Sequence, residues 1–201
     1  LIFLTASIYR RLFILALLAR IPWLWEVPRY IDELREVNLA YLIYRGEALP
    51  LTNVARDIGA LHNYILAGVF KLLGPSIYWP RFYVALTSAF TVVLVYFLGK
   101  KLYGHWTGLI AALLLLGNGM HILVTHMAWS NCTTPFFFSL AMLATLICQE
   151  KGSGKWLMFA AFLWGLTLQT HSSIIIYILV FIIYVFTPHF RQNNAIAWKY
   201  Y

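Results

Sequence analysis

The sequence is poor in charged residues and in cysteine. Only 11% of its 201 residues are charged, against roughly a quarter in a soluble domain, and 62% are hydrophobic. The mean hydropathy is +0.74. This composition excludes an ordinary soluble protein and predicts an integral membrane protein. The 8 Trp, 13 Tyr and 14 Phe residues fit aromatic belts at both membrane interfaces.

Cys132 and Cys148 are the only cysteines, and they lie 16 positions apart in or beside one apolar segment. A helix rises ~1.5 Å per residue, so the two thiols are too distant for a disulfide. Neither cysteine has a partner at metal-ligand spacing, and no pair of histidines has the spacing of a zinc site. We therefore expect no disulfide and no cofactor, and the sequence does not indicate a divalent metal.

Acidic residues are scarce and concentrated in one stretch. Four of the seven lie between Glu26 and Glu36, beside an apolar segment, and ionisable groups next to hydrocarbon commonly mark function. The net charge of +8 comes from basic residues in the connections between apolar segments. This distribution indicates membrane topology rather than binding to nucleic acid.

Apolar runs and turn residues predict an all-α polytopic membrane bundle of about six transmembrane helices. The first loop, residues 26–80, contains two further segments. One is an amphipathic helix with Tyr30, Leu34, Val37, Tyr41 and Tyr44 on one side and polar residues on the other, ended by Gly46. The second, 57–73, stops at Gly74-Pro75. The predicted spans are Leu12–Trp25, Tyr78–Gly99, Thr107–Thr125, Pro135–Cys148, Trp156–Leu168 and Ser173–Phe186.

The basic residues decide whether 57–73 crosses the membrane. If it lies on the surface, the basic residues of the remaining connections fall on one side, with Glu150 as their only acid. This is the positive-inside pattern. Residues 26–80, 126–134 and 169–172 then share the non-cytoplasmic face. The basic residues on the opposite side are Arg10, Arg11, Lys100, Lys101, Lys151, Lys155, Arg191 and Lys199.

Asp32 and Glu33 are adjacent carboxylates at a predicted helix start. On a helix they point about 100° apart, so they cannot both face one atom. One can act as a general base while the other is a helix-end or ion-pair group. The alternative is that both merely favour a helix N-terminus, where the helix dipole stabilises carboxylates.

Further polar residues fall on the same face. Arg81 follows Pro80 at the water-exposed end of a span, where it can contact lipid headgroups or hold a phosphate bidentately. His62, His126 and His171 either anchor the interface individually or line one polar cavity. Asn131, beside Trp129, combines an aromatic platform with a hydrogen-bonding group, a combination suited to a sugar ring.

The order of these features resembles the C-type membrane glycosyltransferases, of the protein O-mannosyltransferase and aminoarabinose-transferase kind. The resemblance covers nearly the whole chain but only the amino-terminal half of a usual member, and the chain is expected to be a fragment. It departs from the family at Asn63-Tyr64, which replaces a proline pair, and at His126, where relatives often carry Arg. The stretches that carry it are Arg20–Pro22 before Asp32-Glu33, Tyr41–Gly46, His62, Gly74–Ser76 before Arg81, Leu94–Gly104 and Gly165–His171.

The resemblance implies one glycosyltransferase domain over 1–201, lacking its carboxy-terminal part. It implies a polyprenyl-phosphate sugar donor, a protein, lipid or glycan acceptor, and a site on the non-cytoplasmic face of the plasma or endoplasmic reticulum membrane. Asp32 would be the general base, and Arg81, helped by His62 or Lys71, would stabilise the leaving phosphate. The alternative, a non-catalytic transporter or scaffold, predicts ionisable residues within the spans, and few occur there.

Overall fold

The computed structural model describes residues 2–187, and these residues form α-helices without a β-strand. The expected all-α class is therefore confirmed for the described part of the chain. The helices are α1 (Ile2–Leu18), α2 (Ile31–Tyr44), α3 (Leu61–Leu73), α4 (Trp79–Tyr103), α5 (His105–Leu116), α6 (Gly119–Val124), α7 (Ser130–Lys151), α8 (Gly154–Leu168) and α9 (Ile174–Val185).

Two described helices are long and apolar enough to cross a membrane. They are α4, with 25 residues, and α7, with 22, which correspond to lengths of ~37 and ~33 Å. A bilayer core is about 30 Å thick, so each of these helices can span it. Helices α5, α8 and α9 are apolar but have only 12 to 15 residues. The count of six spans stays a prediction.

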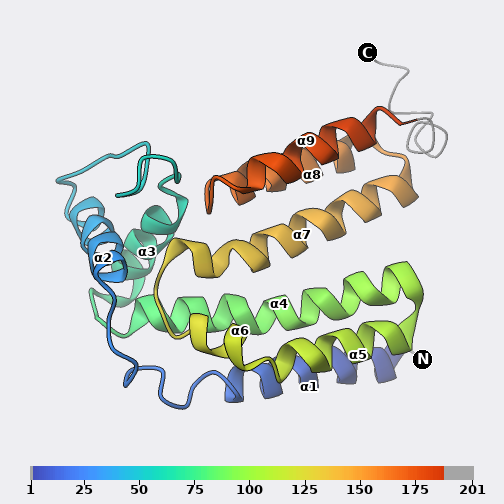
Figure 1. Cartoon of the computed structure of the whole chain (residues 1–201), viewed down its shortest axis with the longest axis horizontal. Helices are drawn as coiled ribbons and strands as arrows, with labels where there is room; N and C mark the ends of the chain where they lie inside the picture. Colours follow the sequence, from blue (N-terminus) through green and yellow to red (C-terminus); the bar gives the residue numbers. More distant parts are fainter. Residues whose placement is uncertain (1, 188–201) are drawn as a thin grey trace.

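The long helices run side by side and carry one group of helices each (Figure 1). Helices α1 and α5 pack on α4 around Leu12, Ala89 and Tyr96. Helices α8 and α9 pack on α7 around Trp164 and Phe181. The two groups are joined mainly through α4 and α7, so these two helices form the centre of the bundle.

A close approach of glycines joins α4 to α5. A Cβ added at Gly108 would lie 2.4 Å from the Tyr96 carbonyl oxygen, and one added at Gly99 would lie 2.7 Å from the Gly108 Cα. Real side chains do not fit at such distances. The two glycines therefore allow the backbones of this helical hairpin to touch.

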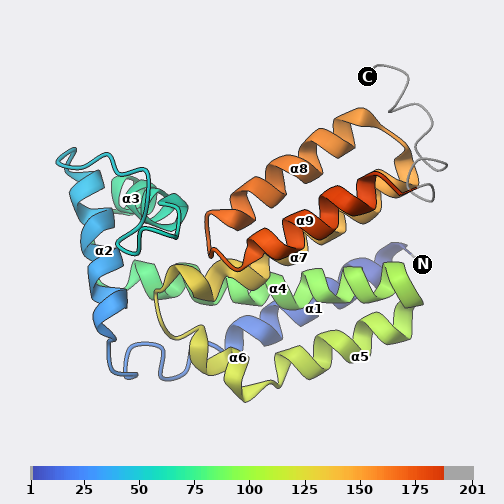
Figure 2. The ribbon, with the colours of Figure 1, turned by 45° about the horizontal axis from the view of Figure 1, so that its top comes forward.

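Helices α2 and α3 lie across one end of the bundle, at a steep angle to the long helices (Figures 1 and 2). They pack on each other around Ala40, Leu66 and Phe70. Their ends agree with the sequence: α2 ends just before Gly46, which has a φ of 74°, and α3 ends at Gly74, which has a φ of 83°. This transverse pair forms most of the expected first outer loop.

Two of the predicted spans end earlier than expected, and the predicted span Pro135–Cys148 is longer at both ends, since α7 covers Ser130–Lys151. The first helix ends at Leu18 and does not continue to Trp25, because Pro22 supplies no N–H and disfavours helical geometry in the residue before it. The segment expected to be one helix over 107–125 breaks after Leu116. There the Asn118 side chain accepts a hydrogen bond from the His121 N–H and begins the separate helix α6.

The orientation of the polar side of α2 was also unexpected. Glu33 and Glu36 are buried against the bundle, whereas Leu34, Tyr41 and Tyr44 are exposed. The amphipathic helix is present, but part of its polar side packs on protein rather than facing water. The reason is tertiary, since α4 and α7 supply partners for both carboxylates.

Candidate active site

Three segments far apart in the sequence meet at the end of the bundle covered by α2 and α3. The Asn53 side chain donates to Ser130 Oγ (3.3 Å), His62 Nε2 contacts the Ala128 carbonyl oxygen (3.3 Å), and Ser172 Oγ donates to Asp57 Oδ2 (3.0 Å). Parts of residues 26–80, 126–134 and 169–172, which are expected on one membrane face, are therefore in contact. The membrane face on which they lie stays a prediction.

Glu33 and Arg81 form a buried ion pair at the start of α2 and α4. Arg81 Nε donates to Glu33 Oε1 (2.7 Å) and Nη2 donates to Oε2 (2.8 Å). The remaining N–H groups point to the carbonyl oxygens of Leu24 (2.9 Å), Val27 (2.8 Å) and Pro28 (3.5 Å). Every N–H of the guanidinium therefore has an acceptor, and Arg81 fastens the loop before α2 to the bundle.

Asp32 has the opposite environment to its neighbour. Its side chain is 60% exposed in the first turn of α2, and the Arg35 Nη1 atom lies 4.0 Å from its Oδ1. An exposed pair at this distance contributes little free energy. The adjacent carboxylates are thus divided: Glu33 is held inside, whereas Asp32 is open to water.

Glu36 forms a second buried polar cluster, one turn after Glu33. Its carboxylate accepts hydrogen bonds from the Ser130 N–H (2.8 Å) and Oγ (3.0 Å) at the start of α7. Burial raises the pKa of the Glu36 carboxyl, although the Ser130 hydrogen bonds oppose that effect. The sequence analysis did not single out Glu36. The available signal was its i, i+3 spacing from Glu33, which places both carboxylates on one side of α2.

His62 belongs to the same cluster. Its Nε2 lies 3.9 Å from Glu36 Oε2, and the neighbouring Asn63 donates to the Glu36 carbonyl oxygen (2.9 Å). Burial lowers the pKa of His62 to about 4, so the ring is neutral at pH 7. Its Nδ1 has no hydrogen-bond partner among residues 2–187. A neutral, enclosed imidazole cannot supply positive charge to a phosphate.

The other residues expected in the site do not form one cluster. Both ring nitrogens of His126 contact carbonyl oxygens, of Ile122 (2.6 Å) and Pro22 (2.8 Å). Asn131 lies in the first turn of α7. His171 Nδ1 contacts Ser173 Oγ (2.8 Å) in the turn before α9. Lys71 is exposed on α3. No described contact joins any of these four residues to Asp32.

Arg20 is a further buried cation, and the sequence analysis noted it only within the resemblance. Its Nε donates to Ser88 Oγ (2.5 Å), Nη1 donates to the Ala16 carbonyl oxygen (2.9 Å), and Nη2 lies 2.9 Å from His121 Nδ1. No carboxylate pairs with it within the described residues. The side chain fastens the end of α1 to α4 and α6.

The part of the chain covered by the structure holds no group of three or more His, Cys, Asp or Glu side chains arranged to bind a metal ion. Both cysteines are buried and free. The described acidic side chains of the site instead find nitrogen and hydroxyl partners within the protein, as Glu33 and Glu36 do.

The described part of the chain is an all-helical bundle with a carboxylate doublet at one end, and comparison with known families gives its class, a membrane glycosyltransferase. The family model described as dolichyl-phosphate-mannose-protein mannosyltransferase matches residues 57–201, which is well over half of the chain. The chain belongs to this family of C-type membrane glycosyltransferases. No curated protein and no solved structure matches it. Asp32 and Glu33 precede the matched range.

Proposed function

We propose that the protein transfers a sugar from a polyprenyl-phosphate donor to a hydroxyl group of a protein, lipid or glycan acceptor. The reaction takes place at the non-cytoplasmic membrane surface, with Asp32 as general base. Family membership supports the reaction class. The observation that carries the choice of base is the division of the doublet: Asp32 is open to a substrate, whereas Glu33 is occupied by Arg81.

A general base must reach the proton that it removes. The Asp32 carboxylate can accept a hydrogen bond from an acceptor hydroxyl without losing a strong protein contact, because its described partner lies 4.0 Å away. Glu33 would first have to leave Arg81, and breaking a buried ion pair costs about 3–5 kcal/mol. Access therefore favours Asp32 as the base.

In the proposed step, Asp32 takes the proton of the acceptor hydroxyl as its oxygen attacks the anomeric carbon. A new glycosidic C–O bond forms while the bond between that carbon and the phosphate oxygen breaks. The electron pair of the broken bond leaves with the polyprenyl phosphate. Charge therefore accumulates on the phosphate, and a nearby cation lowers the barrier.

The proposed task of Arg81 is to position the base. Its bidentate contact fixes Glu33, and adjacent helical side chains point about 100° apart, so fixing Glu33 directs Asp32 outward. Arg81 has no N–H left for a phosphate unless it gives up one of its partners.

Arg35, beside Asp32 and 63% exposed, is the cation that we assign to the leaving phosphate. Asn131 and His171 stay as proposed contacts to the sugar or acceptor, whereas His126 would have to give up a carbonyl partner to make one.

The direct test is a transfer assay on membranes that contain the full-length protein, with labelled polyprenyl-phosphate sugars as donors. We expect one donor to release polyprenyl phosphate in step with labelled acceptor. The Asp32→Asn variant, inserted to the same level, serves as the matched control. If Asp32→Asn membranes transfer sugar at the wild-type rate, the assignment of the base is wrong, even where the reaction class holds.

A further inference from the structure

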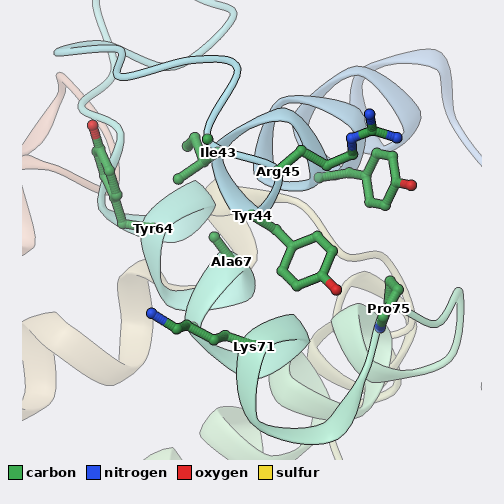
Figure 3. Close-up of a pocket in the computed structure, with 10 residues that line it drawn as sticks. Ile43, Tyr44, Arg45, Tyr64, Ala67, Lys71 and Pro75 are labelled. Atoms are coloured by element: carbon green, nitrogen blue, oxygen red, sulfur yellow. The ribbon is translucent and has the colours of Figure 1, made fainter.

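Two adjoining hollows form a groove between α2 and α3, with volumes of about 840 and 310 Å³. Tyr41 and Pro75 line both hollows, so the two lie next to each other. Figure 3 shows the larger one, with Tyr44 at the end of α2 and Arg45 just after it, above Lys71 from α3. The groove therefore runs along α2 and changes character from one end to the other.

The larger hollow is basic and less apolar than the smaller one. Lys71 has no carboxylate partner among the described residues, whereas Arg45 is paired with Glu47 at 2.7 Å. No acidic residue lines this hollow. An exposed ammonium group without a carboxylate partner is complementary to a single negative charge. The lining residues are Tyr41, Ile43, Tyr44, Arg45, Gly46, Tyr64, Ala67, Gly68, Lys71 and Pro75.

The smaller hollow is mainly apolar. Its walls come from Leu34, Val37 and Phe70, and Ile77 closes the end next to the start of α4. Beside it, Tyr78 packs edge to face on Trp25, and both rings are largely exposed. Exposed Tyr and Trp at the end of a membrane span are typical of the headgroup level. The groove thus has an apolar end and a basic end at that level.

The groove is separate from the proposed base. Asp32 and Tyr41 are nine residues apart on α2, which at about 100° per residue places them on opposite sides of the helix. Leu34, Val37 and Asn38 share the Tyr41 side. A molecule in the groove therefore has α2 between itself and Asp32.

We propose that this groove binds an anionic phospholipid of the surrounding bilayer. Its phosphate lies against Lys71, and the upper part of an acyl chain follows Leu34 and Phe70. Charge complementarity, the headgroup level and the apolar end select this occupant over a soluble anion. The bound lipid holds the transverse pair α2 and α3 on the membrane, and it is not the sugar donor.

Gly68 offers a variant that blocks the groove without disturbing the protein. It lies in the wall of the larger hollow, and a Cβ added there meets no atom within 4 Å. Gly68→Leu therefore fills space that only a ligand would occupy. Leucine is also a better helix former than glycine by up to about 1 kcal/mol, so α3 is expected to remain stable.

The test uses the full-length protein in phosphatidylcholine nanodiscs with and without phosphatidylglycerol. Bound phosphatidylglycerol is counted by native mass spectrometry, and a photoreactive analogue maps its position. Lys71→Gln is expected to lower retention of phosphatidylglycerol about fivefold, since one basic residue near an anionic membrane contributes about 1 kcal/mol. Gly68→Leu is expected to abolish labelling of the groove, and Lys71→Arg to preserve it.

Arg56→Gln removes the same charge from an exposed position in the same loop, outside the groove, and is the matched control. It should retain phosphatidylglycerol at the wild-type level. Equal losses for Arg56→Gln and Lys71→Gln would overturn the proposal in favour of diffuse surface charge. Wild-type retention by both groove variants would also overturn it, as would capture of polyprenyl phosphate in place of phosphatidylglycerol. None of these outcomes depends on transferase activity.

Discussion

Glu33 and Asp32 differ in environment although they differ little in chemistry. The sequence analysis inferred that two neighbouring helical carboxylates point in different directions, but it could not identify which one faces inward. That choice depends on Arg81, which lies 48 positions later in the chain. The same limit applies to Glu36, whose partner Ser130 is 94 positions away. The residues of the site were therefore predictable as types and positions, whereas their partners were not.

The Glu33–Arg81 pair should behave as a unit in a double-mutant cycle. Replacing either residue alone with Met leaves an unpaired buried charge and is expected to cost about 3–5 kcal/mol, measured as loss of thermal stability in detergent. Replacing both should cost less than the sum of the single changes. Asp32→Asn, at an exposed position, is the control and should melt as wild type does. Additive losses for Glu33 and Arg81 would show that the pair is not coupled.

His62 predicts a loss of stability in mild acid. Its pKa falls from 6.5 to about 4 on folding, so the folded state resists protonation and the stability present above pH 6.5 is lost as the pH falls toward 4. Between pH 7 and 5 this contribution amounts to about 2 kcal/mol. Glu36 has the opposite sign, because its raised pKa favours the folded state in acid.

Comparison of wild type with His62→Gln isolates the histidine, since Glu36 is present in both proteins. Denaturation at pH 7 and pH 5 should show the larger acid-induced loss in the wild type. Equal losses in the two proteins would mean that His62 titrates normally in the folded state.

At the scale of helices, apolar runs and turn residues predicted most elements. Gly46 and Gly74 end helices where the sequence indicated a stop. The errors arose where a capping hydrogen bond or a proline ends a helix inside an apolar run. Asn118 caps a new helix inside an apolar run, and the end of α1 is set by the turn around Pro22. Hydropathy records the burial of side chains, and it does not record a local hydrogen bond of this kind.

The contact between α4 and α5 predicts different effects of one substitution at two helical glycines. Gly108→Ala would place a Cβ 2.4 Å from the Tyr96 carbonyl oxygen and 2.6 Å from the Lys100 nitrogen, so the hairpin must separate and stability should fall. Gly165→Ala in α8 meets no atom within 4 Å and should raise stability by up to about 1 kcal/mol. Melting of the two variants in the same detergent provides the test. Equal effects would contradict the close approach.

At the scale of the whole molecule, the distribution of charge predicts membrane orientation. The Lys101–Glu150 ion pair joins the ends of α4 and α7, and the transverse pair lies at the opposite end of these helices (Figure 1). In a variant with Cys132 and Cys148 replaced by Ala, Ala48→Cys should react with an impermeant thiol reagent added from the non-cytoplasmic side. Ser153→Cys should react only after permeabilisation. Labelling of both positions from one side would refute the orientation.

The central claim is that Asp32 is the general base. Turnover at saturating donor, measured for Asp32→Asn and Glu33→Gln beside membrane insertion and thermal stability, tests it most directly. Asp32→Asn keeps the shape of the side chain and removes its basicity, so turnover should fall by ~10²-fold or more with unchanged stability. Glu33→Gln should lose stability through Arg81 and retain more turnover per folded molecule. A larger loss of turnover per folded molecule in Glu33→Gln, or mild and equal losses in both, would contradict the assignment.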